Sequence, residues 1–174
     1  TKMLVLEAVK ALREVNSALF AILTRMQELA RTLPEYPTVR AMGGVGDILS
    51  VKLIAEIGDV RRFHSSKGLI AYAGIDPPPY ESGKLIGTNR HITKRGSATL
   101  RKIGYEVMRC VKAGGRSEED PAVYDFMIKK EDEGKAKRVA KIAALNKFLR
   151  IYYARVMEVY SANQLIEVLI CTVC

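Results

Sequence analysis

The feature that most constrains this chain is a long uninterrupted stretch at its beginning, residues 2–33. The stretch contains no glycine or proline, and Pro34 follows it directly. It therefore predicts one long helix that ends before the proline, because a proline ring interrupts the hydrogen bonds of a helix.

The apolar side chains of this stretch recur in two overlapping heptad frames. One frame consists of Val5, Ala8, Leu12, Val15, Leu19, Ile22, Met26, Leu29 and Leu33, and the other of Val5, Val9, Leu12, Asn16, Leu19, Leu23, Met26, Ala30 and Leu33. Two adjacent seams make a broad apolar face, and a helix with such a face is not stable alone in water. We expect a partner helix from the C-terminal part of this chain or from a second copy, with Asn16 fixing the register. An ordinary bundle helix that buries a wide stripe is the alternative.

The remainder of the chain predicts a mainly α fold. After a turn in the segment 39–60, we expect a helix with Ser50, Leu53, Ile54 and Ile57 on one side. Further helices are expected near residues 65–73, 98–112, 121–133 and 136–159. Ser97 is a candidate N-cap and Gly74 a candidate stop. The only candidate strand lies around residues 85–92, in a short loop or hairpin. We expect three parts: an oligomerisation helix over 1–34, a helical domain over 35–160, and a short apolar tail over 161–174 that packs on a neighbour.

Positive charge is concentrated in one part of the chain. The 174 residues carry a formal net charge of +9, and residues 84–116 contain nine lysines and arginines against one acid, Glu106. A second basic cluster lies between Lys129 and Arg155. Charge gathered in this way indicates a polyanionic partner rather than a general contribution to solubility.

Residues 39–60 resemble a helix-hairpin-helix, with a turn at Gly44, Val45 and Gly46. Such a turn presents backbone N–H groups at a helix N-terminus, where a phosphate can bind. Plain packing is an equally good explanation of two glycines in a turn. Many DNA glycosylases with this motif place a catalytic lysine after the second glycine, but Asp47 and Ile48 stand there, so a glycosylase is not expected.

The cysteines do not indicate a disulfide scaffold. Cys110, Cys171 and Cys174 are few and unevenly placed, and only His64 and His91 could add zinc ligands, in no paired spacing. We expect free thiols in a reducing cytoplasm and no metal site in this chain. No stretch is apolar over a length that would span a bilayer, so no membrane partner is expected.

Ser82 stands directly before Gly83 and after three consecutive prolines, Pro77 to Pro79. Those prolines form a stiff extended segment that would hold the serine in place. No histidine or aspartate stands at a recognisable triad spacing from it. From the residues alone, Ser82 is a turn residue.

Several segments occur together in one order. They are GGVGDILSVKLIAEIGDVRRFHSSKGLIAYAGIDP, then SGK, then HITKRGSATLRK, then GKAKRVAKIAALNKFLRIYY. This set resembles the C-terminal transposase domain of the DEDD-type insertion-sequence transposases, also called bridge-RNA-guided recombinases, to which the Piv-type invertases are related. The resemblance extends from Tyr36 to about Tyr153.

The resemblance implies that Ser82 is the DNA nucleophile and forms a covalent phosphoserine intermediate. It implies a composite active site completed by an RuvC-like domain whose acidic residues bind Mg²⁺. We expect this chain to be a piece of a larger enzyme without that domain, and Mg²⁺ to belong to the full-length protein. The helix over residues 2–33 then corresponds to the coiled coil of the family and forms a homo-oligomer. DNA and a guide RNA are the implied partners.

The predicted site follows from these arguments. Ser82 is the predicted catalytic residue. The predicted DNA-binding residues are Gly44, Gly46, Lys84, Arg90, His91, Lys94, Arg95, Arg101 and Lys102. Two functions remain open: the part of a DNA recombinase that supplies the serine for strand cleavage and exchange, and a non-catalytic module for nucleic-acid binding and dimerisation.

Overall fold

The computed structural model describes residues 2–77, 81–82, 85–86 and 91–173. Its helices are α1 (Lys2–Arg31), α2 (Tyr36–Arg40), α3 (Asp47–Ile57), the 3-10 helix η1 (Val60–Arg62), α4 (Ser66–Ala73), α5 (Ala98–Gly114), α6 (Ala122–Asp132) and α7 (Lys137–Val173). Two short strands, β1 (Glu81–Ser82) and β2 (Leu85–Ile86), pair antiparallel. The predicted mainly α fold with a long first helix is therefore confirmed.

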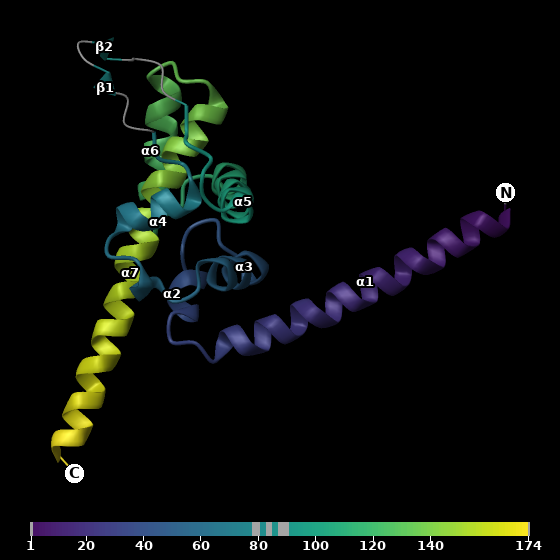
Figure 1. Ribbon diagram of the computed structural model, residues 1–174, viewed down its shortest axis with the longest axis horizontal. Helices are drawn as coiled ribbons and strands as arrows, with labels where there is room; N and C mark the ends of the chain where they lie inside the picture. Colours follow the sequence, from purple (N-terminus) through teal and green to yellow (C-terminus); the bar gives the residue numbers. More distant parts are fainter. Residues whose placement is uncertain (1, 78–80, 83–84, 87–90, 174) are drawn as a thin grey trace.

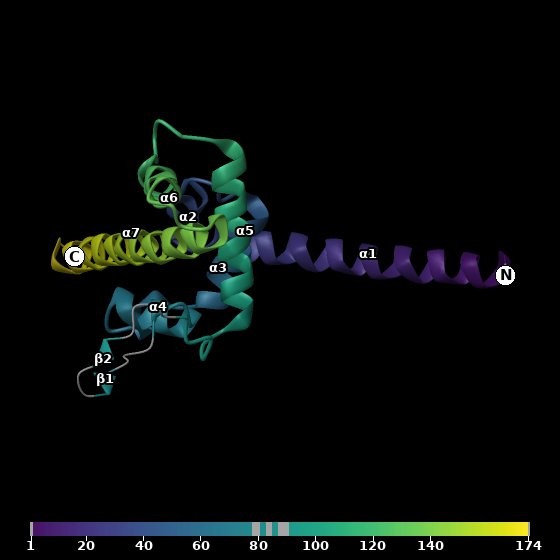
Figure 2. The same ribbon diagram turned by 90° about the horizontal axis from the view of Figure 1, so that it is seen from above.

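The helical body is built around the first part of α7. This helix packs against α2, η1, α4, α5 and α6, and Figure 2 shows α4 and α6 on opposite sides of it. The almost fully buried side chains of α7 include Leu145, Phe148, Leu149, Tyr152 and Val156. Their spacing of about three to four residues places them on one side of the helix, so α7 supplies the centre of the core.

Two predicted helix boundaries rest on local chemistry that the structure confirms. Ser97 is the N-cap of α5, and its side chain accepts a hydrogen bond from the N–H of Leu100 at 2.9 Å. Gly74 ends α4 in the left-handed conformation, with φ of 62°. These two residues therefore set the ends of the segment that links α4 to α5.

Helix α1 extends away from the body over most of its length (Figure 1). Its residues from Lys2 to Ile22 are exposed, and Leu4 and Phe20 each leave 74% of their surface accessible. Ala30, near the end of α1, is its one buried residue. The apolar face of α1 is thus not buried against the described part of this chain, unlike the stripe of an ordinary bundle helix.

Helix α7 is longer than predicted. We expected it to end near residue 159, with a separate tail after it, but it continues to Val173. The sequence from 161 to 174 contains no glycine or proline that would stop a helix. Leu165 in this extension is exposed, and packing of the tail on a neighbour stays a prediction. None of the helices in the described ranges has the length and apolar character of a membrane span.

Candidate nucleic-acid interface

A basic cleft lies where the segment before α5 meets the first turns of α5 and α7. Its volume is about 640 Å³. The residues that line it are His91, Ile92, Lys94, Arg101, Lys102, Tyr105, Arg138, Val139 and Ile142. No carboxylate is among these lining residues, and the cleft joins four basic side chains of residues 91–102 to Arg138 of α7.

The segment that carries His91 and Lys94 is fixed to the end of α4 by its backbone. Thr93 donates its N–H to the carbonyl of Asp76 at 3.0 Å, and its hydroxyl to the Asp76 carboxylate at 2.8 Å. Lys94 donates its N–H to the carbonyl of Gly74 at 2.9 Å. Lys94 also has a positive φ of 55°, an uncommon conformation for a residue with a side chain, and these hydrogen bonds hold it there.

Arg101 has a structural role as well as a place in the cleft. Its Nη1 donates to the carbonyls of Ala73 and Gly96, each at 3.0 Å. Gly96 lies so close to α4 that an added Cβ would overlap the carbonyl oxygen of Tyr72. Arg101 and Gly96 therefore hold the basic segment against the end of α4.

The structure adds α7 to the predicted site. Arg138 lines the cleft, and Lys141 places its Nζ 5.9 Å from the centre of the Tyr105 ring. The sequence showed a second basic cluster between residues 129 and 155, but it did not show which of those cations faces the first cluster. That juxtaposition depends on how α5 packs on α7.

Comparison with known sequences shows what part of this chain is similar to. Residues 36–120 match the sequence model of the transposase IS116/IS110/IS902 family. Over this segment the chain is similar to that family. The matched segment contains α2 to α5 and all the predicted site residues, whereas Arg138 and the rest of α7 follow it.

Similar proteins carry names that agree with this assignment. The chain is 32% identical over 115 residues to the pilin gene-inverting protein of Moraxella bovis. The aligned segment makes up 66% of this chain and 34% of that protein. It is 31% identical over 81 residues to the transposase for insertion sequence element IS1111A of Coxiella burnetii, covering 45% of this chain and 21% of that protein. The chain thus matches about a third or less of the length of these relatives.

In the matched segment, the two turn glycines are not among the residues that line the basic cleft. Gly44 has a φ of 76°, and an added Cβ would overlap Val111 Cγ2 and lie 2.8 Å from Val111 N on α5. Gly46 has no atom within 4 Å of such a Cβ. The close approach of Gly44 to α5 supports the packing explanation for this residue, and a phosphate contact at either glycine stays a prediction.

Charged residues around this turn also favour packing over phosphate binding. Asp47 begins α3 and forms an ion pair with Arg40. The hydrogen bond from Arg40 lowers the pKa of the Asp47 carboxyl, so a negative charge already occupies the helix N-terminus. Gly43 donates its N–H at 3.1 Å to the side chain of Asp120, which also receives two hydrogen bonds from Arg155 at 2.9 and 3.1 Å.

Ser82 belongs to β1 and pairs with Leu85 of β2. The described residues do not include Gly83, Lys84 or Arg90. The side chain of Ser82 also lies outside what the structure describes. The predicted roles of Ser82, Lys84 and Arg90 stay predictions.

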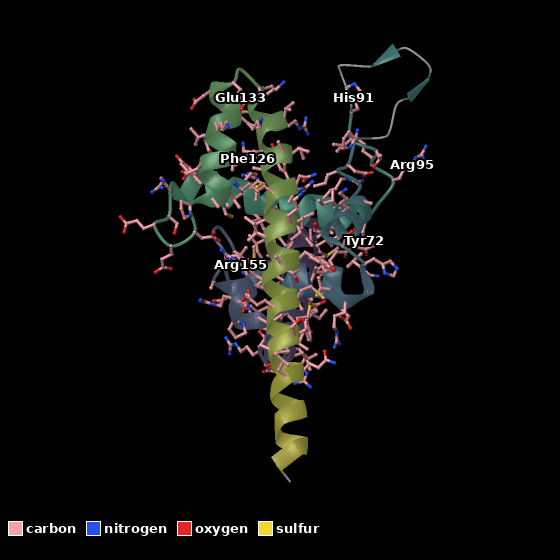
Figure 3. The ribbon with its side chains drawn as sticks, turned by 90° about the vertical axis from the view of Figure 1, so that its left-hand side faces the viewer. Tyr72, His91, Arg95, Phe126, Glu133 and Arg155 are labelled. Atoms are coloured by element: carbon pink, nitrogen blue, oxygen red, sulfur yellow. The ribbon has the colours of Figure 1, made fainter. Side chains whose placement is uncertain are left out.

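Arg95 is exposed but is not among the residues that line the cleft. In Figure 3 its side chain points away from the helical body, while His91 lies on the segment above it. Of the predicted basic residues on the described segments, His91, Lys94, Arg101 and Lys102 thus line one cleft and Arg95 does not.

No metal site is formed by the part of the chain that the structure describes. Within those residues, no three histidine, cysteine, aspartate or glutamate side chains are grouped so that they could hold an ion. Among the described residues, the carboxylates that would suit Mg²⁺ are thus not grouped as a metal site. The Mg²⁺ predicted for the full-length protein stays an expectation.

Polar contacts join the connector between α1 and α2 to α7. Glu35 is 4% exposed and accepts a hydrogen bond from the Tyr160 hydroxyl at 2.8 Å. The guanidinium of Arg61 lies 4.4 Å from the centre of the Tyr160 ring. Burial, and then the hydrogen bond to Glu35, raise the pKa of Tyr160 to about 12. The connector that follows α1 is therefore held on α7 by these polar contacts, while the end of α1 itself contacts α2 and α3.

Proposed function

We propose that this chain is the C-terminal part of an insertion-sequence transposase or DNA invertase, which binds DNA and supplies a serine nucleophile. The family match and the names of the similar proteins support DNA transposition or recombination. The observation that carries the binding proposal is the cleft in which His91, Lys94, Arg101, Lys102 and Arg138 meet, with no carboxylate among its described lining residues. Such a surface suits phosphates and would hold the DNA backbone by charge.

In the proposed reaction, the Ser82 hydroxyl attacks a DNA phosphodiester. A bond forms between Ser82 Oγ and phosphorus, while the bond from phosphorus to one deoxyribose oxygen breaks. That oxygen leaves as a hydroxyl, because it gains the proton that the serine gives up. In strand exchange a hydroxyl of the second DNA strand reverses these steps and frees the serine. The cations of the cleft would hold the flanking phosphates in place.

The binding proposal is tested by measuring DNA affinity against salt concentration. Neutralising two cleft cations, Lys102→Gln with Arg138→Gln, should reduce the slope of log K against log salt by about 2, because two fewer counterions are released. Arg150→Gln is the matched control: Arg150 is an exposed arginine of α7 outside the cleft, bonded only to Asn146 among the described residues. A flat salt dependence of the unaltered chain would overturn the proposal.

The catalytic proposal is tested in the full-length protein with Ser82→Ala. We expect strand transfer to be lost while DNA affinity is retained, because the substitution removes only the attacking oxygen. Unchanged recombination would remove Ser82 from the mechanism and leave the alternative function, a non-catalytic module for nucleic-acid binding and dimerisation. A guide RNA would be a further partner, and RNA included in the binding assays tests it.

We also propose that α1 pairs with α1 of a second copy. Large apolar side chains of both heptad frames are exposed along it, among them Val5, Leu12, Val15, Leu19 and Ile22, and an apolar surface of this length requires a cover. Leu12→Glu with Leu19→Glu should turn an oligomer into a monomer in sedimentation velocity. The control is Lys10→Glu, which lies outside both frames. An unaltered chain that sediments as a monomer at micromolar concentration would refute the pairing.

A further inference from the structure

The basic cleft has an apolar floor in addition to its charged rim. Ile92, Val139 and Ile142 line it together with the ring of Tyr105. Val139 leaves 54% of its surface exposed, although it lies on the helix that supplies the core. Phosphates alone would need only the cations, so the apolar floor indicates a ligand that also has an apolar face.

Each of the two helices places an arginine next to a residue with an apolar surface in the cleft. On α5, Arg101 is followed by Tyr105 four residues later, and on α7, Arg138 is followed by Ile142 four residues later. Residues at this spacing are neighbours on one helix face, about 5–6 Å apart at Cβ. Each wall of the cleft therefore offers a cation beside an apolar surface, which matches a nucleotide with its phosphate and its base.

The Tyr105 ring has the properties of a stacking surface. It is partly exposed, it lines the cleft, and Lys141 lies 5.9 Å from its centre. Every base offers a flat π-face, and proteins that bind single strands combine such aromatic rings with cations that follow the backbone. Bases of an intact duplex are stacked on one another and are not available to a side chain of this kind.

We propose that the cleft binds an unpaired nucleotide, with its base against Tyr105, Val139 and Ile142 and its phosphates on Lys94, Lys102 and Arg138. This inference rests on the proposed function and adds to it that the bound nucleic acid is single-stranded at the cleft, so that its base is not paired. The shared chemistry is an unpaired base with its phosphates, and a displaced DNA strand or a single-stranded RNA could supply it.

The first experiment uses the absence of tryptophan from the sequence. Tyr105→Trp introduces a single indole at the cleft, and its emission is titrated with a single-stranded DNA of 15 or so nucleotides, an RNA of the same sequence and the DNA duplex. We expect saturable quenching by one or both single strands, because a stacked base quenches indole, and little change with the duplex. The arm that quenches at lower concentration identifies the DNA or the RNA source.

The second experiment measures affinity by fluorescence anisotropy of labelled strands. Tyr105→Leu should weaken single-strand binding by about 5- to 150-fold, the loss expected for one stacked base, and leave duplex binding nearly unchanged. Tyr105→Phe should retain the affinity, because it keeps the ring. Tyr124→Leu and Tyr124→Trp are matched controls, since Tyr124 has the same kind of contact, a lysine Nζ 5.9 Å from its ring centre, but lies outside the cleft.

The outcomes separate this inference from the proposed function. If single strands bind but Tyr105→Leu, folded as judged by circular dichroism, leaves their affinity unchanged and Tyr105→Trp is not quenched, the inference is overturned and the proposed function stands. If Tyr105→Leu weakens duplex and single strand equally, the cleft binds phosphates only, and the stacking role is also overturned. If neither single strand nor duplex binds at low salt, both proposals are overturned.

Discussion

Replacing Gly44 by alanine distinguishes packing from phosphate binding in the turn between α2 and α3. Gly44 has a φ of 76°, and an added Cβ would overlap Val111 Cγ2 and lie 2.8 Å from the Val111 backbone nitrogen. The left-handed conformation costs an alanine about 1–2 kcal/mol, and the overlap adds about 1–3 kcal/mol. We expect Gly44→Ala to lower the free energy of unfolding by about 2–5 kcal/mol. For a chain of this size that lowers the Tm by about 4–20 °C.

The assay is thermal and urea denaturation followed by circular dichroism, with Gly46→Ala as the matched control. Gly46 has an extended φ of −98° and open space where the Cβ would be. It is the N-cap of α3, so its substitution should cost only about 1 kcal/mol in the free energy of unfolding, the difference between glycine and alanine at this position. DNA affinity of both variants is measured below their unfolding temperature. If Gly44→Ala is as stable as the unaltered chain and loses DNA affinity, the turn contacts phosphate and the packing explanation is wrong.

Three further predictions concern the contacts that hold the body together. Asp120→Ala should cost about 2 kcal/mol in urea denaturation, because it leaves Arg155 and a backbone N–H without their partner; an unchanged midpoint would contradict this. Gly96→Ala should displace the basic segment from α4 and weaken DNA binding in anisotropy assays, since its Cβ would overlap a carbonyl oxygen; unaltered affinity would show that the segment adapts. The folded state should become less stable as the pH rises from about 10 towards 12, because Tyr160 then ionises. The pKa of Tyr160 in the folded state is raised to about 12, above its usual value of about 10. The stability that neutral Tyr160 contributes is therefore fully present below about pH 10 and is lost as the pH rises through about 12. Tyr160→Phe should reduce this fall in stability while weakening the fold at neutral pH, because Glu35 loses its donor; an identical alkaline profile would contradict the assignment.

Much of the helical layout could be predicted from local sequence. The N-cap of α5 at Ser97 and the stop of α4 at Gly74 were both predicted, because each depends on the chemistry of one residue and its near neighbours. The end of α7 was predicted wrongly, at 159 instead of Val173. The apolar run near the C-terminus suggested a separate tail. However, this run contains no glycine or proline, the residues that usually end a helix, so α7 continues through it.

The candidate site could be predicted only in part. The concentration of cations before and within α5 pointed to His91, Lys94, Arg101 and Lys102, and these four line one cleft. Arg138 and Tyr105 were not identified, because no local pattern says which residues of two separate helices face each other. For the same reason the sequence could not show that Arg101 also holds a backbone turn in place.

By itself, the sequence determined the helical character of the chain, the broad apolar face of its first helix and the excess of positive charge, since these follow from the spacing and type of neighbouring residues. The tertiary structure decided which cations share a cleft, that apolar side chains form its floor, and that Gly44 packs against α5. These features depend on contacts between segments far apart in the chain, and such contacts form only when the helices pack around α7.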